Sequence, residues 1–231
     1  MFLYDDPDEQ APEIYARLAQ RLNNWLTLRS GAGVLFETDL RLRPDGVSGL
    51  MVSSIDSFRR YQREAAWTWE HQALSRARFC AGDAAVGAAF ELDRRHILGL
   101  KRDLRQLRAD ILEMREKLLQ GHPNSSALFD IKHDRGGMID IEFMVQYLVL
   151  AHCHEYPALQ ANDGNIALLQ AAAAHGLISA EDARKMREAY RIFRRRQHAL
   201  RLAGERYARV PREELAAHSQ ATLDLWRRLL R

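Results

Sequence analysis

The chain of 231 residues is poor in cysteine and lacks a long apolar segment. Its two cysteines, Cys80 and Cys153, lie 73 residues apart without the spacing of a disulfide or metal motif. We therefore expect two reduced thiols in a cytoplasmic protein. The longest apolar run, residues 138–150, is interrupted by three polar side chains, which argues against a membrane span. Acidic residues from position five onward argue against a secretory signal peptide.

An excess of charge of one sign is also missing. The chain has 34 basic and 31 acidic residues and a formal net charge of +3, so no global field favours nucleic-acid binding. The basic excess is local, because eleven of the basic side chains lie between Arg184 and Arg212. A solvated helix face is the default interpretation of this stretch, and docking to an acidic partner is the alternative. The sequence also has no Gly-rich phosphate loop and no Ser/His/Asp order of a catalytic triad.

Apolar periodicity predicts a mixed first part and a helical second part. Strands are expected at residues 34–42 and near 50–52, and helices at 13–28, from Asp56, and at 67–79, 84–98, 104–119, 138–153, 165–175, 181–202 and 212–230. The fold class is therefore α+β and mostly helical, with domains at 1–82 and 83–231, the second an all-helical bundle. The opening Phe2-Leu3-Tyr4 is typical of the end of a strand whose beginning is absent. We therefore expect the chain to be a fragment.

The most informative segment is Phe36-Glu37-Thr38-Asp39-Leu40-Arg41-Leu42-Arg43-Pro44. Read with the period of a strand, it places Glu37, Asp39, Arg41 and Arg43 on one face. Carboxylates bind divalent cations or take protons, and forked guanidinium groups suit phosphate oxygens. This face therefore indicates phosphoryl or nucleotidyl chemistry. An amphipathic edge strand with a salt-bridged outer face is an equally weighted alternative.

Two further segments carry weaker signals. The helix of Trp67-Thr68-Trp69-Glu70-His71-Gln72 leads to Arg76, which is either a phosphate ligand or part of a core helix with packed tryptophans and solvated charges. Gly136-Gly137 precedes the apolar helix at 138–153, where free N–H groups could hold an anion. A structural clasp is favoured there. Glu142 lies inside that helix and needs a partner, for which Lys132 or Arg135 is the expected candidate.

Five segments in order resemble the bacterial glutamine synthetase adenylyltransferase family. They are residues 36–44, Tyr61-Gln62, Ala66-Trp67-Thr68-Trp69-Glu70-His71-Gln72-Ala73-Leu74, Met114-Arg115-Glu116-Lys117, and Asp130-Ile131-Lys132 through Ile141-Glu142-Phe143. The resemblance extends over essentially the whole chain. The segment at residues 66–74 is similar to the C-terminal half of that family, which attaches AMP rather than removing it.

The resemblance implies a polymerase-beta-like nucleotidyltransferase domain in residues 1–82, followed by a regulatory and docking bundle. Such a site needs a Gly-Ser turn and an Asp-x-Asp pair, which in this family lie on the strand just ahead of the equivalent of Phe2-Leu3-Tyr4, and the resemblance implies that this segment is missing here. Asp39 matches the third carboxylate of the set. The domain is therefore expected to be N-terminally truncated and the chain to be inactive or weakly active.

The implied reaction is transfer of AMP from ATP to a tyrosine of glutamine synthetase, with Mg²⁺. Asp39 and Glu37 are the expected catalytic carboxylates, with Asp39 also the metal ligand. Arg41, Arg43 and Arg76 are the expected phosphate ligands. The implied partners are glutamine synthetase and the PII signal protein, without nucleic acid or membrane. The alternatives are a regulatory module without chemistry and the half that removes AMP by phosphorolysis; a helical bundle unrelated to nucleotides ranks third.

Overall fold

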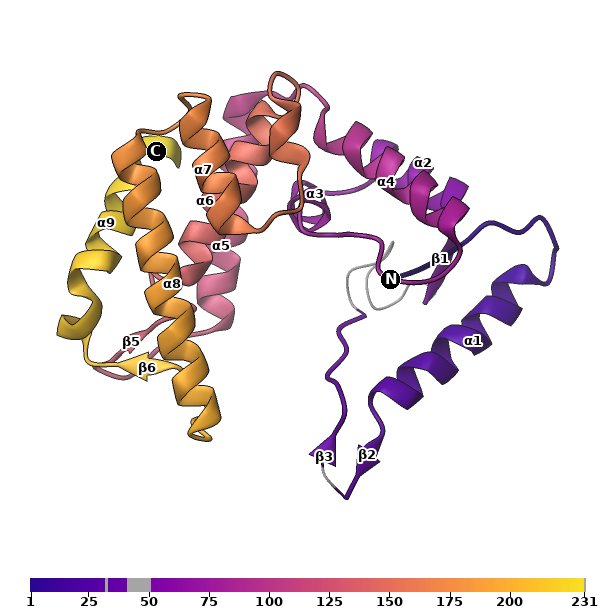
Figure 1. Ribbon diagram of the computed structural model, residues 1–231, viewed down its shortest axis with the longest axis horizontal. Helices are drawn as coiled ribbons and strands as arrows, with labels where there is room; N and C mark the ends of the chain where they lie inside the picture. The colour runs from indigo at the N-terminus through magenta and orange to yellow at the C-terminus, as the bar shows by residue number, and fades with distance from the viewer. Residues whose placement is uncertain (32, 41–50, 231) are drawn as a thin grey trace. The chain divides into compact units, whose positions relative to one another are not determined.

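The computed structural model describes residues 1–31, 33–40 and 51–230 (Figure 1). They form two compact units, one of Met1–Ala73 and Ala77–Ile97, the other of Leu74–Arg76 and Leu98–Arg231. Within the described residues, none of the helices is both long and apolar enough to cross a bilayer. The fold is mostly helical with a few short strands, as the sequence predicted.

Among its described residues, the first unit contains a small parallel sheet, a short hairpin and four helices. Its elements are β1 (Phe2–Tyr4), α1 (Ala11–Leu26), β2 (Arg29–Ser30), β3 (Gly33–Val34), β4 (Val52–Ser54), α2 (Ile55–Glu64), α3 (Thr68–Leu74) and α4 (Ala84–Leu98). Strands β1 and β4 pair in parallel, with Phe2 opposite Val52. Strands β2 and β3 pair in an antiparallel hairpin. The parallel pair confirms the predicted strand at the start of the chain.

The strand predicted over residues 34–42 is wrong for the part that the structure describes. Only Val34 lies in a strand, β3, and residues 35–40 have no regular structure. The backbone instead returns along the end of α1, where the Phe36 N–H donates to the Leu26 carbonyl at 2.9 Å. A strand needs a neighbour that pairs with its N–H and C=O groups. An alternating side-chain pattern does not supply that neighbour.

Helix α4 belongs with the first unit because of its contacts. Its Phe90 ring lies 5.8 Å from the Phe58 ring of α2, centroid to centroid, and its Asp93 pairs with Arg59 of α2. The compact units therefore divide after Ile97, whereas the sequence analysis placed a boundary after residue 82, where the strand signal ends. The functional division at that residue stays a prediction.

The second unit is a helical bundle around α6 (Figure 1). Its elements are α5 (Leu104–Gly121), β5 (Phe129–Asp130), α6 (Met138–His152), the 3₁₀ helix η2 (Pro157–Gln160), α7 (Asn165–Ala174), α8 (Ala180–Leu202), β6 (Arg209–Val210) and α9 (Arg212–Leu230). Thirteen of the 15 residues of α6 are buried, and α6 contacts α5, α7, α8 and α9. A helix that is apolar all round belongs in a core, so this element is the centre of the bundle.

The start of α6 is held by a buried ion pair. The guanidinium of Arg115 in α5 pairs with Asp140, and both side chains are almost fully buried. Arg115 also donates to the His133 carbonyl at 2.8 Å, and Asp140 accepts the Gly136 N–H at 2.6 Å. A methyl group on Gly137 would approach the Ile131 carbonyl oxygen to 2.7 Å. The two glycines therefore form a structural clasp, as the favoured interpretation predicted.

Removal of Arg115 tests this ion pair. We expect Arg115→Leu to lower the free energy of unfolding by about 3–5 kcal/mol, because Asp140 remains buried without its counter-charge. The matched control is Arg135→Leu, since Arg135 forms an exposed pair with Glu116, and exposed pairs contribute less than about 1 kcal/mol. Urea denaturation followed by circular dichroism measures both. Equal losses in the two variants would contradict the assigned role of the buried pair.

Asp130, at the end of β5, gives the second unit an acid-sensitive contact. Burial raises the pKa of Asp130, but hydrogen bonds from the His133 ring and from the His133 and Lys132 N–H groups outweigh burial and lower the pKa to about 2. A carboxyl group whose pKa is lower in the folded state stabilises the fold above its unfolded pKa of about 3.9, and that stabilisation is lost as the pH falls.

We therefore expect Asp130→Asn to destabilise the protein by about 2 kcal/mol at neutral pH. The difference between the wild type and the variant should shrink as the pH falls from about 4 to about 2, because the wild-type carboxylate takes up its proton in that range. Urea denaturation at several pH values measures this difference. A difference that stays constant down to pH 2 would show that the charge of Asp130 does not stabilise the fold.

Candidate functional site

Glu37 and Asp39 lie in the irregular segment that follows β3. Both side chains are exposed, and the segment is attached to α1 by Thr38, whose hydroxyl donates to the Asn23 side-chain oxygen at 2.6 Å. The two carboxylates therefore belong to the first unit and are open to solvent. Arg41 and Arg43 lie outside the described residues. The common face predicted for them with Glu37 and Asp39 therefore stays a prediction.

The acidic residues after β1 have local structural partners. Asp6 accepts a hydrogen bond from the Tyr15 hydroxyl at 3.1 Å, and this bond, with burial and the nearby charge, raises the pKa of Tyr15. Asp8 accepts the Gln10 N–H at 2.7 Å just before α1. These carboxylates order the connection between strand and helix. Neither contact brings them to Asp39.

A charge network that the sequence analysis missed surrounds Arg59 of α2. The Arg59 Nε donates to both oxygens of Asp93, at 2.8 and 3.0 Å, and its Nη1 lies 2.6 Å from Asp56. The hydrogen bond with Asp93 raises the pKa of Arg59. The spacing of Asp56 and Arg59 was a readable signal for half of this network. Asp93 lies on another helix, and no local pattern pointed to it.

In the segment that joins α2 to α3, the tryptophans were expected to be buried and the charged side chains to be solvated, but the structure shows the reverse for Trp67 and Glu70. Trp67 is 69% exposed, whereas Glu70 and His71 are buried. Glu70 accepts the Tyr61 hydroxyl at 3.0 Å and the Trp67 N–H at 2.9 Å, which is the returning half of a capping box. The His71 ring lies 3.0 Å from the Gln62 carbonyl. The segment is a structural corner, but its acid is packed and its first tryptophan faces solvent.

Arg76 belongs to the second unit, not to the unit that carries Asp39. Its Nη1 lies 3.3 Å from Glu142 of α6, which also accepts the Tyr190 hydroxyl at 2.9 Å. Burial and the Glu142 charge raise the pKa of Tyr190. Arg76 and Tyr190 are therefore the partners of Glu142, in place of the expected Lys132 or Arg135. The Arg76 side chain remains 53% exposed.

The described residues do not by themselves form a metal site. They contain no group of three or more His, Cys, Asp or Glu side chains placed to hold one ion. Magnesium in nucleotide enzymes is usually bound by one or two carboxylates together with substrate phosphates and water. Asp39, as an exposed carboxylate, fits the role of one such ligand and does not make a site alone.

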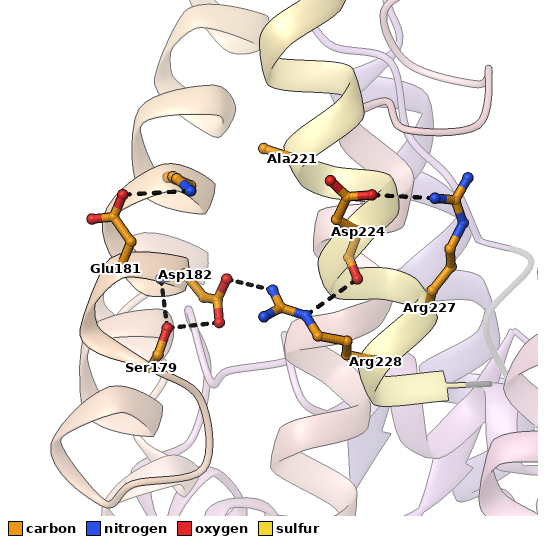
Figure 2. A pocket seen from close by; sticks show the side chains of 8 residues that line it. Ser179, Glu181, Asp182, Ala221, Asp224, Arg227 and Arg228 are labelled. Carbon is orange, nitrogen blue, oxygen red and sulfur yellow. Dashed lines mark hydrogen bonds and ion pairs between the residues drawn. The ribbon is translucent and has the colours of Figure 1, made fainter.

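A cavity of about 560 Å³ lies beside the start of α8 and the end of α9 (Figure 2). Its charged side chains neutralise one another. Arg228 pairs with Asp182 at 2.5 Å, Arg227 with Asp224 at 3.2 Å, and Lys185 with Glu181 at 3.5 Å. Because each of these cations already has a carboxylate partner, the cavity carries no excess charge of either sign.

The comparisons with known proteins divide the chain near the same place as its compact units. Residues 1–93 match the sequence model of the glutamate-ammonia ligase adenylyltransferase family. Residues 105–222 match the model of the PII-uridylyltransferase family.

Three curated relatives are each named a bifunctional glutamine synthetase adenylyltransferase/adenylyl-removing enzyme. The protein of Aromatoleum aromaticum is 55% identical over 98% of this chain and 24% of its own length. That of Burkholderia mallei is 54% identical over 99% of this chain and 25% of its own, and that of Nitrosomonas eutropha 52% identical over 98% and 26%. The chain thus spans about a quarter of the length of these relatives. It belongs to the glutamine synthetase adenylyltransferase family.

Proposed function

We propose that the chain is part of an enzyme that transfers AMP from ATP to a tyrosine of glutamine synthetase. The observation that carries this proposal is the 55% identity over 98% of the chain to a relative named for adenylyl transfer to glutamine synthetase. The adenylyltransferase model matches residues 1–93, so we assign the chemistry to the first unit. We assign the chain to the half that attaches AMP, on the resemblance of residues 66–74 to that half of the family.

The proposed reaction is an in-line displacement at the α-phosphorus of ATP. The tyrosine oxygen forms the new P–O bond, the bond to the β-phosphate oxygen breaks, and pyrophosphate leaves. Asp39 is the proposed acceptor of the phenol proton or ligand of the Mg²⁺ that accompanies ATP, and its exposed position supports either role. Glu37 is the proposed second carboxylate. Arg41 and Arg43 are proposed to contact the phosphates.

The second unit is proposed to regulate this reaction and to bind partner proteins. Its match to the PII-uridylyltransferase model over residues 105–222 supports this role, and the PII signal protein is the proposed regulator. The same match supports a second candidate function, a purely regulatory module. The names of the relatives include adenylyl removal, which keeps the phosphorolytic half as the other candidate.

An AMP-transfer assay tests the role of Asp39. The assay compares the chain alone with a chimera in which the residues that precede the matched region of the Aromatoleum relative are joined before Met1. We expect transfer in the chimera and at least a ~100-fold loss in Asp39→Asn, because a positioned acid or base contributes about that much. The matched control is Glu9→Gln, another exposed carboxylate of the first unit, which should retain wild-type transfer.

Other outcomes of this assay separate the alternatives. Wild-type transfer by Asp39→Asn would show that Asp39 has no catalytic role. Phosphate-dependent release of ADP from modified glutamine synthetase, without forward transfer, would identify the adenylyl-removing half. No reaction in either direction would favour the regulatory module.

A second prediction concerns Arg76 as a phosphate ligand. The Arg76 Nη1 lies 3.3 Å from Glu142. A guanidinium has five N–H donors, so we propose that Glu142 positions Arg76 while other donors of the same group bind ATP. We expect Arg76→Lys in the chimera to raise the KM for ATP about tenfold with little change in kcat, as for lost ground-state binding. A lower unfolding free energy with an unchanged KM would assign Arg76 a structural role only.

A further inference from the structure

The second half of α8 carries a row of side chains directly opposite its buried face. Arg191, Arg195, His198 and Leu202 are spaced by four, three and four residues, which places them on one side of the helix. The helix buries Met186, Ala189 and Phe193 on the other side. All four side chains of the row are exposed. We call this row the α8 stripe.

The cations of the α8 stripe differ from those elsewhere on the same helix. Arg184 pairs with Glu181 at 2.8 Å and with Glu188 at 3.4 Å, and Arg196 pairs with Glu214 of α9 at 2.9 Å. Arg191 and Arg195 have no ion-pair partner within the described residues, and neither has Arg194 at the edge of the stripe. Their charge is therefore not neutralised inside the second unit.

The C-terminal end of the α8 stripe combines charged with apolar side chains. Leu202 is 90% exposed, and the nearby Tyr207 is exposed while Arg206 and Arg209 lie over its ring at 5.2 and 4.3 Å. Arginine and tyrosine are enriched among the residues that dominate binding at protein interfaces. The stripe extends about 16 Å from Arg191 to Leu202, at the usual rise of a helix.

We propose that the α8 stripe is the surface on which this protein docks an acidic face of its protein substrate. The inference rests on the function proposed above, which makes glutamine synthetase that substrate. Unpaired guanidinium groups bind carboxylates through two parallel hydrogen bonds, so the partner surface presents Asp or Glu side chains. Leu202 requires an apolar neighbour among them, which a protein surface supplies and a phosphate backbone does not.

Binding of the 231-residue chain to unmodified glutamine synthetase tests the docking surface. Biolayer interferometry with immobilised glutamine synthetase is run at about 50 and about 150 mM salt, because screening weakens exposed charge pairs. We expect Arg191→Glu/Arg195→Glu to weaken binding about 30-fold at the lower salt concentration. The charge-matched control is Lys101→Glu/Arg105→Glu, two exposed cations of which one precedes α5 and one lies in its first turn. This control should change binding less than threefold.

Two further variants probe the chemistry of the surface. Leu202→Ser should weaken binding about tenfold at both salt concentrations, because it removes apolar contact rather than charge. Arg191→Lys/Arg195→Lys keeps the charge and should lose only part of the affinity, since lysine cannot form the paired hydrogen bonds. Circular dichroism of each variant checks that its total helix content equals that of the wild type.

The outcomes distinguish this inference from the proposed function. Binding that depends on the stripe, without AMP transfer by the chimera, would support docking and overturn the proposed activity. AMP transfer with equal binding by the stripe variant and the control would overturn docking and leave the activity. Absence of wild-type binding would overturn docking. A DNA duplex is added as a competitor. If the stripe variant loses binding to DNA but keeps its binding to glutamine synthetase, the stripe is a nucleic-acid surface and the proposal is overturned.

Discussion

The structure of the second unit depends on hydrogen-bond partners for the first turn of its buried central helix, α6. Helix α6 is buried almost along its whole length, so the N–H groups of its first turn have no access to water and need partners. The carbonyls of Ile131 and Lys132 accept two of them, and the Arg115–Asp140 pair holds the loop that presents these carbonyls. The buried ion pair therefore fixes the position of the central helix, and the surrounding helices pack on it.

Much of this arrangement was readable from the sequence because its signals are local. The predicted helices of the second unit agree with α5 to α9 within about two residues at each end. Ser179 caps α8 by accepting the Asp182 N–H at 3.0 Å. Periodicity and capping both act within a few residues. A helical bundle is largely specified by such signals, whereas the partner of Arg115 required contact between two helices.

The failures of prediction have the opposite character. Residues 35–40 alternate like a strand, yet they have no regular structure, and the Phe36 N–H donates to the Leu26 carbonyl at the end of α1. Glu70 is buried and Trp67 is exposed, the opposite of the expected arrangement. Glu70 can be buried because the Tyr61 hydroxyl, six residues before the segment, donates a hydrogen bond to its carboxylate. The candidate site is affected most, since Arg76 pairs with Glu142 and Arg59 pairs with Asp93, and both partners are distant in the sequence. No period or motif encodes such contacts.

The charges of α8 show where stability does and does not explain a residue. Like charges four residues apart destabilise a helix by a few tenths of a kcal/mol, and Arg191 and Arg195 have that spacing. In the first half of α8, Glu181 and Glu188 form ion pairs with Arg184. The charges of that half are therefore balanced within the helix. The second half keeps its repulsion and also exposes Leu202 to water. Neither feature stabilises the isolated bundle, but both become favourable when a carboxylate-bearing protein surface covers the helix.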